Sequence, residues 1–212
     1  MEKIIKEKIS SLLSQEEEVL SVEQLGGMTN QNYLAKTTNK QYIVKFFGKG
    51  TEKLINRQDE KYNLELLKDL GLDVKNYLFD IEAGIKVNEY IESAITLDST
   101  SIKTKFDKIA PILQTIHTSA KELRGEFAPL IDWEYSSMND PRWDLAALFL
   151  ESEFTSQEEE TFLSHYESDQ TPVSHEKIAI YKILQDTIWS LWTVYKEEQG
   201  EDFGDYGVNR YQ

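Results

Sequence analysis

The chain contains no cysteine and only three histidines among its 212 residues. Without cysteine there can be no disulfide framework and no thiolate chemistry. Basic residues are also scarce, because 23 lysines and arginines stand against 38 aspartates and glutamates and leave a net charge of −15. This charge argues against nucleic acid or an anionic membrane as a partner, and it suits a cationic ligand.

Long apolar runs are missing as well. The N-terminal residues Met1-Glu-Lys-Ile-Ile-Lys6 mix charged and apolar side chains, so we find no signal peptide and no transmembrane span. We therefore expect a cytoplasmic protein, either a monomer or a homodimer. Its length allows a sizeable core, as one domain or as two small lobes.

Apolar periodicity and turn residues predict the order of the elements. We expect a helix over 2–14, strands over 19–25, 32–37 and 41–47, a helix over 58–70 closed by Gly71, and a strand over 85–90. Asp98-Ser-Thr100 is expected to cap a long helix through about residue 123. From Asp144 onward the chain is predicted to be helical, with a helix start behind Thr155 and Ser156.

A glycine-rich turn separates the first two expected strands. In Gly26-Gly27-Met28-Thr29-Asn30-Gln31-Asn32, glycine allows the backbone to approach phosphates, and Thr29, Asn30 and Asn32 add donors. Lys45 follows in a buried strand, where a lysine needs a partner, and Glu60 follows on the next helix. Alone, the turn could be an ordinary hairpin and Lys45 a strand-edge residue, but their order with Glu60 favours nucleotide binding.

Aromatic side chains gather in the C-terminal part. Trp189 and Trp192 lie three residues apart on a predicted helix, with Tyr195 three further on, so they share one face. Such a stripe is usually core. Its alternative role is to bind a quaternary ammonium group, which has no N–H to donate and is held by aromatic faces. Asp202-Phe-Gly204 we interpret as a helix stop.

The stretches Leu130-Ile-Asp132-Trp-Glu-Tyr135 and Asp140-Pro-Arg-Trp-Asp144-Leu-Ala resemble the metal-binding strand of small-molecule kinases that share the protein-kinase fold. The resemblance implies an α+β, two-lobe architecture. Residues 1–91 would form a nucleotide-binding lobe with an antiparallel sheet plus helix, and 92–212 a mostly helical substrate lobe. It also implies ATP and Mg²⁺ as cofactors, with Asp132 on the metal and the backbone of Glu89 and Ile91 on adenine.

The combined motifs resemble one branch of that family, the bacterial LicA-type choline kinases. They include Gly-Gly-Met-Thr-Asn-Gln-Asn-Tyr, Tyr-Ile-Val-Lys45, Asn88-Glu-Tyr, Ile131-Asp-Trp-Glu-Tyr and Trp189-Ser-Leu-Trp192. The resemblance implies phosphorylation of choline to phosphocholine, which would feed decoration of teichoic acid or other surface polymers. The implied choline site comprises Tyr135, Glu151, Trp189, Trp192 and Tyr206.

The family's catalytic loop, of the form His-x-Asp-x-x-x-x-Asn, has no counterpart among the three histidines, His117, His165 and His175. Only Arg124 to Pro129 separate the long predicted helix from the strand of Asp132, which is too short for a loop, a strand and a turn. Either a segment between 129 and 130 has been deleted, or the 212-residue sequence omits mobile residues. We favour the second explanation, because exposed loops are commonly lost.

Three rival hypotheses stay open. The protein could be a kinase for another amine, such as ethanolamine or an aminoglycoside. It could be a pseudokinase that binds its ligands without turnover, as the missing loop indicates. A helical interaction protein is the weakest alternative, because Lys45, Glu60 and Asp132 fall in kinase order.

Overall fold

The structure is a computed structural model that describes residues 2–11, 17–26, 30–48, 50–51, 55–72, 74–119, 121–122 and 139–211. The chain forms two compact units. The described residues up to Ile95 belong to the first unit, and those from Thr96 through Glu122 and from Asn139 onward belong to the second. The boundary expected from the sequence lay four residues earlier, after Ile91.

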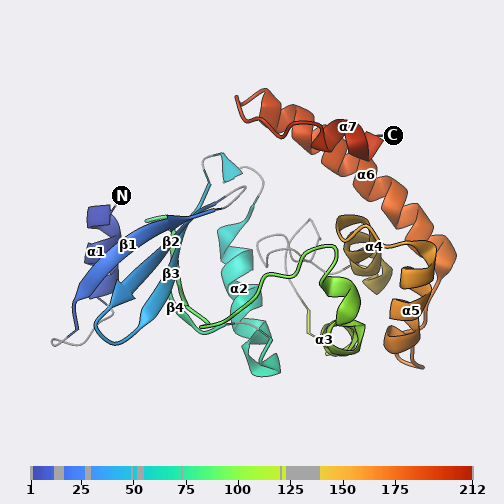
Figure 1. Cartoon of the computed structure of the whole chain (residues 1–212), viewed down its shortest axis with the longest axis horizontal. Helices are drawn as coiled ribbons and strands as arrows, with labels where there is room; N and C mark the ends of the chain where they lie inside the picture. The colour runs from blue at the N-terminus through green and yellow to red at the C-terminus, as the bar shows by residue number, and fades with distance from the viewer. Residues whose placement is uncertain are drawn as a thin grey trace. The chain divides into compact units, whose positions relative to one another are not determined.

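The first unit is built on a five-stranded sheet (Figure 1). Its strands are β1 (Val19–Leu25), β2 (Gln31–Thr37), β3 (Gln41–Phe46), β4 (Asn76–Asp80) and β5 (Ile85–Glu89). Every pairing is antiparallel, and the order across the sheet is β1-β2-β3-β5-β4. The strand β5 therefore lies between β3 and β4, and it brings a segment distant in sequence next to the middle of the sheet.

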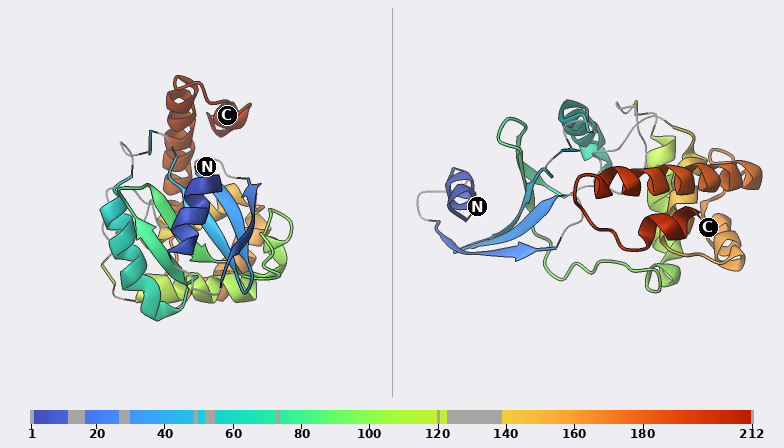
Figure 2. Two further views of the ribbon diagram at one scale, coloured as in Figure 1. Left: turned by 90° about the vertical axis from the view of Figure 1, so that its left-hand side faces the viewer. Right: turned by 90° about the horizontal axis from the view of Figure 1, so that it is seen from above.

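Each face of this sheet is covered by one helix, α1 (Glu2–Ser10) or α2 (Arg57–Leu67) (Figures 1 and 2). Ile5 and Ile9 of α1 are fully buried against Val44 and Val87 of the sheet. The opposite face meets α2, which begins at the N-cap Asn56 and continues as the short 3₁₀ helix η2 (Lys68–Leu70). Gly71 ends this helical stretch in the left-handed conformation, with φ of 65°, as its sequence position predicted.

The second unit is helical. It contains η3 (Ile102–Thr104), α3 (Phe106–Thr118), α4 (Pro141–Glu151), α5 (Ser156–Tyr166), α6 (His175–Glu197) and α7 (Tyr206–Tyr211). Aromatic rings fill its core, among them Phe106, Phe149, Phe154 and Phe162. The expected start of α5 is confirmed by a capping box, in which Thr155 and Glu158 each bind the other's backbone.

Two local expectations were wrong. The helix expected from residue 98 begins only at Phe106, because the Asp98 carboxylate accepts hydrogen bonds from the amides of Thr100 and Ser101 and caps a separate turn. The strand β4 was not predicted. A register shift between Asn76 and Leu78 lets the adjacent Tyr77 and Leu78 both pack on the core, so the alternation typical of a strand is lost.

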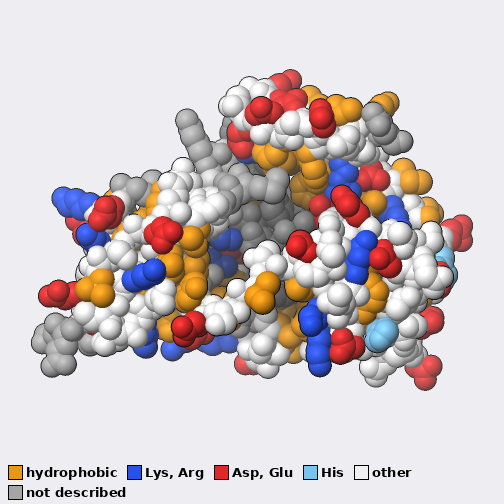
Figure 3. Space-filling view, viewed as in Figure 1, with side chains coloured by type: hydrophobic (Ala, Val, Ile, Leu, Met, Phe, Trp, Pro, Cys, Tyr) orange, Lys and Arg blue, Asp and Glu red, His pale blue; other side chains and the backbone are white. Residues whose placement is uncertain are grey.

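The helix α6 exposes a row of apolar side chains, which is part of the orange surface in Figure 3. The members at least 45% exposed are Ile180, Ile183, Leu184, Leu191 and Val194. Even so, no helix in the described residues is both long and apolar enough to cross a membrane.

Candidate active site

A buried ion cluster links α2 to the sheet. The Glu60 carboxylate, 2% exposed, accepts a bond of 2.7 Å from Arg57 Nη1 and lies 3.3 Å from Lys86 Nζ. Arg57 also donates to Thr51 Oγ1 at 3.0 Å and stacks on Phe47, 4.1 Å from the ring centroid. A buried carboxylate is stable only when it is paired in this way.

Lys45 lies in the same row of the sheet as Lys86. The register pairs Asn32 with Lys45 and Lys45 with Lys86 across β2, β3 and β5. Residues directly opposite one another project to the same face, so all three side chains lie on the face that α2 covers. The expected partnership of Lys45 with Glu60 stays a prediction.

The glycine-rich turn is partly described. Gly27 and Thr29 lie outside the described residues. Asn30 is buried and its side-chain oxygen accepts from the amide of Gly48 at 3.1 Å, which ties the turn to the end of β3. Asn32 donates to the carbonyl of Gly26 at 2.9 Å. Its own side-chain oxygen is buried with no hydrogen-bond partner in the described part of the chain, so it is available as an acceptor.

The segment expected to meet adenine follows β5. The amide of Glu89 donates to the carbonyl of Lys75 at 2.8 Å, and the carbonyl of Ile91 accepts from Ala94 at 3.3 Å. Ile91 is 50% exposed. These bonds give the segment a defined shape, and its adenine contacts stay a prediction.

Two of the residues expected to bind choline meet in the second unit. The Tyr206 hydroxyl lies 3.3 Å from Glu151 Oε1, and burial followed by the charge of Glu151 raises the pKa of Tyr206. Arg210, one turn after Tyr206, forms an ion pair with Glu151 and a second one of 2.9 Å with Asp186. Sequence reasoning missed Arg210; its spacing of four from Tyr206 on a short helix was the available signal.

The tryptophan pair also forms. Trp189 and Trp192 contact edge to face, with centroids 5.7 Å apart. Trp192 packs against Phe203 at 4.8 Å, and Lys196 Nζ lies 5.8 Å from its centroid. Both indole rings are half-buried. Trp192 therefore contributes to packing, and Asp202-Phe-Gly204 anchors the segment after α6.

Asp132 and Tyr135 lie outside the described residues. The described residues contain no group of three or more potential metal ligands.

A separate buried network joins α3, α4 and α5. His117 forms hydrogen bonds of 2.8 Å with Asp144 and 2.7 Å with the Tyr166 hydroxyl. Burial raises the pKa of Asp144 despite the opposing bond from His117. This network was not predicted as a site.

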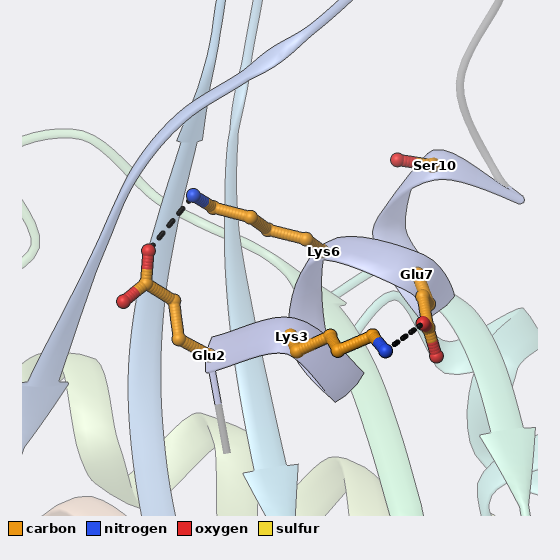
Figure 4. A pocket seen from close by; sticks show the side chains of 5 residues that line it. All are labelled: Glu2, Lys3, Lys6, Glu7 and Ser10. Atoms are coloured by element: carbon orange, nitrogen blue, oxygen red, sulfur yellow. Dashed lines mark ion pairs between the residues drawn. The ribbon is translucent and has the colours of Figure 1, made fainter.

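A surface hollow on α1 offers no comparable chemistry. It is lined by Glu2, Lys3, Lys6, Glu7 and Ser10 of that single helix (Figure 4). Its charges pair with one another, at 2.8 Å for Lys6 with Glu2 and 3.9 Å for Lys3 with Glu7. Exposed pairs of this kind contribute little energy and leave no charge in surplus.

Comparison with known proteins defines the class first. No protein-family model matches the chain. A crystal structure of LicA in complex with AMP is 76% identical, covers 100% of this chain and 96% of that chain, and has a TM-score of 0.89. The architecture is thus the α+β kinase-like fold, an antiparallel sheet unit followed by a helical unit.

The particular family follows from a second structure. Choline kinase LicA from Streptococcus pneumoniae is 75% identical, covers 99% of this chain and 95% of that chain, and has a TM-score of 0.92. The chain therefore belongs to the LicA choline kinase family.

A more distant relative bears on the missing loop. Protein LicA of Haemophilus influenzae is 23% identical over 258 aligned positions, covering 88% of this chain and 76% of that protein. Because 88% of 212 residues is about 187, about 70 of the 258 positions fall opposite gaps in this chain.

Proposed function

We propose that this protein transfers the γ-phosphoryl group of ATP to the hydroxyl of choline and so forms phosphocholine. The observation that carries the proposal is the 75% identity to a choline kinase over nearly the whole chain. Binding of AMP by the 76% identical LicA supports an adenine nucleotide as the donor. With ATP as the substrate, the reaction would take place in the cytoplasm, and the product would serve decoration of teichoic acid or another surface polymer.

In the first unit, Lys45 would bind the phosphates, with Glu60 as its support and the turn of Gly27, Thr29, Asn30 and Asn32 closing over them. The backbone of Glu89 and Ile91 would meet adenine. Asp132 would hold Mg²⁺, since a carboxylate oxygen is the ligand this ion prefers. The bound ion would neutralise phosphate charge, and positioning would supply most of the remaining rate.

In the second unit, Glu151, Trp189, Trp192 and Tyr206 would bind choline together with Tyr135. A trimethylammonium group has no N–H donor, so aromatic faces and one carboxylate recognise it better than a set of hydrogen-bond acceptors would. This argument favours choline over ethanolamine or an aminoglycoside, whose ammonium groups carry N–H donors.

Trp189→Ala tests this assignment. Cation–π contacts contribute about 0.5–2 kcal/mol each, so we expect the Kd for choline to rise up to about thirtyfold while the Kd for ATP stays unchanged. Tyr211→Ala is the matched control, because Tyr211 is an aromatic residue 83% exposed in the same unit. An unchanged choline Kd in Trp189→Ala, measured by calorimetry, would remove Trp189 from the site.

The missing His-x-Asp loop decides turnover. We place the positions that the Haemophilus influenzae protein has in excess between Pro129 and Leu130, where the sequence leaves no room for a loop and its strand. A general base contributes about 10²–10⁴-fold to a rate, and the catalytic-loop Asn is a metal ligand. We therefore expect the exact 212-residue polypeptide to bind both ligands with near-zero turnover, which is also the behaviour of a pseudokinase.

The test compares two polypeptides. One is the 212-residue chain, with its intact mass checked against 24.6 kDa, and the other carries the corresponding segment of the Streptococcus pneumoniae enzyme at this junction. Phosphocholine formation by the second alone supports the proposal. Turnover by the first would show that the base lies elsewhere, and failure of both to bind choline would refute the function.

A further inference from the structure

We propose that Lys86 is a positioning residue of the nucleotide site, which acts on Lys45 through Glu60. The inference rests on the proposed function and goes beyond it, because it assigns a role to a side chain that is itself 4% exposed and would not touch the nucleotide. Three observations support it: the contacts of Glu60, the register of the sheet, and the burial of Glu60 with its partners Lys86 and Arg57.

The first observation concerns the carboxylate. Glu60 bonds Arg57 through Oε2 and Lys86 through Oε1, at 2.7 and 3.3 Å. A carboxylate has about four acceptor positions, so the Oε1 held by Lys86 can accept a further donor. Lys86 thereby fixes where that oxygen lies and keeps it directed at the sheet.

The second observation concerns the neighbour. Lys45 stands directly opposite Lys86 in the β3–β5 pairing. Like charges directly opposite each other destabilise a sheet unless a counter-charge lies close to both. Glu60 is the carboxylate on this face that bonds Lys86, so the position of Lys86 sets how Glu60 can share its charge with Lys45.

The third observation is the burial of Glu60 and its two partners. Glu60, Lys86 and Arg57 are 2%, 4% and 7% exposed, so water and salt screen their charges little. Loss of Lys86 therefore leaves Glu60 to attract Lys45 more strongly. This attraction weakens binding of the terminal phosphates that Lys45 is proposed to hold.

The experiment measures the affinities of ATP and AMP by calorimetry, because AMP lacks the terminal phosphates. For Lys86→Met we expect the ratio of Kd(ATP) to Kd(AMP) to rise about tenfold, the usual size of a coupling between sites. Lys86→Arg should restore most of the ratio. Lys36→Met is the matched control, since it removes the same charge from an exposed position of the sheet, and we expect it to leave the ratio unchanged.

A purely structural role of Lys86 would lower stability and leave the ratio as in the wild type, which would overturn the inference. Should Lys86→Met fail to fold, the double variant Glu60→Gln with Lys86→Met removes both buried charges and is compared with Glu60→Gln alone. If the ratio of Kd(ATP) to Kd(AMP) is equal in these two variants, the result supports action of Lys86 through Glu60. A higher ratio in the double variant overturns the inference. Failure of the wild type to bind ATP would instead refute the proposed function.

Discussion

Replacing Gly207 by alanine tests whether α7 must lie tightly against α6 for choline to bind. A Cβ atom at Gly207 would lie 2.7 Å from Cβ, 2.9 Å from Cγ2 and 3.0 Å from Oγ1 of Thr193. Thr193 is 2% exposed on α6, so it has no free space to move into. The added methyl group therefore pushes α7 away from α6.

Two limits bound the energetic effect. Overpacking of this kind costs about 1–3 kcal/mol. The strain energy cannot exceed the energy of the contacts that hold α7 on α6, because α7 would otherwise detach. These include the bond from Ser190 Oγ to the Gly207 carbonyl at 3.0 Å and the ion pair of Arg210 with Asp186 at 2.9 Å, which together stabilise by about 2–4 kcal/mol. We expect a destabilisation of about 2 kcal/mol and a fall in the unfolding temperature of about 4–8 °C.

The functional consequence follows from Tyr206, the neighbour of Gly207, which reaches Glu151 through its hydroxyl. We expect Gly207→Ala to weaken choline binding at least about tenfold, the effect of losing 1.4 kcal/mol of contacts, and to leave ATP binding unchanged. Calorimetric titration of each ligand separates the two effects. Val208→Ala is the control, because Val208 lies on the same helix and is 58% exposed.

A second variant makes the test specific. All three contacting atoms belong to the Thr193 side chain, so Thr193→Gly combined with Gly207→Ala removes the clash. We expect choline affinity to recover, although glycine within a helix costs about 1 kcal/mol of stability. The reasoning is refuted if Gly207→Ala leaves both the unfolding temperature and the choline Kd unchanged, or if the double variant binds choline no better.

Two further predictions concern stability. Ile9→Ala should lower the free energy of unfolding in urea by about 2–5 kcal/mol, because Ile9 is fully buried. Ile4→Ala, at a position 45% exposed, should lower it by less than about 0.5 kcal/mol. Equal losses in the two variants would contradict the packing of α1. For Asp140, burial opposes ionisation, but bonds from Lys177 and Arg142 lower its pKa from 3.8 to about 2. The resulting stability is present above pH 4 and is lost as the pH falls towards 2. Asp140→Asn should therefore lower the free energy of unfolding by about 1 kcal/mol at pH 7, after allowance for solvent screening, and by little at pH 2. A loss of stability that does not depend on pH would contradict this pairing.

The sequence was most informative where the signal is local. The alternation of β2 and β3, the glycine that ends the α2 stretch and the capping box of α5 all depend on residues within a few positions of each other. The kinase-like fold was confirmed because several such signals occur in the right order.

The partners of charged side chains could not be predicted in the same way. Lys86 lies 26 residues from Glu60. It reaches Glu60 because β5 pairs with β3 as well as with β4, the strand before it in the sequence. Arg210 lies 59 residues from Glu151. Each pair is formed by tertiary packing, which hydrophobic periodicity does not reveal. The retrospective signal for Lys86 is that it stands between two buried residues, Ile85 and Val87.

The strand order of the sheet also has a consequence for how the first unit folds. β1, β2 and β3 are joined by short connections, and β4 and β5 form a separate hairpin, so both pieces can form from local contacts. Only the β3–β5 pairing closes a long loop, which places Lys45 opposite a residue 41 positions later. Closing long loops is slow relative to local pairing. We therefore expect docking of the β4–β5 hairpin to be the late folding step of this unit, so that the proposed phosphate-binding face exists only once the sheet is complete.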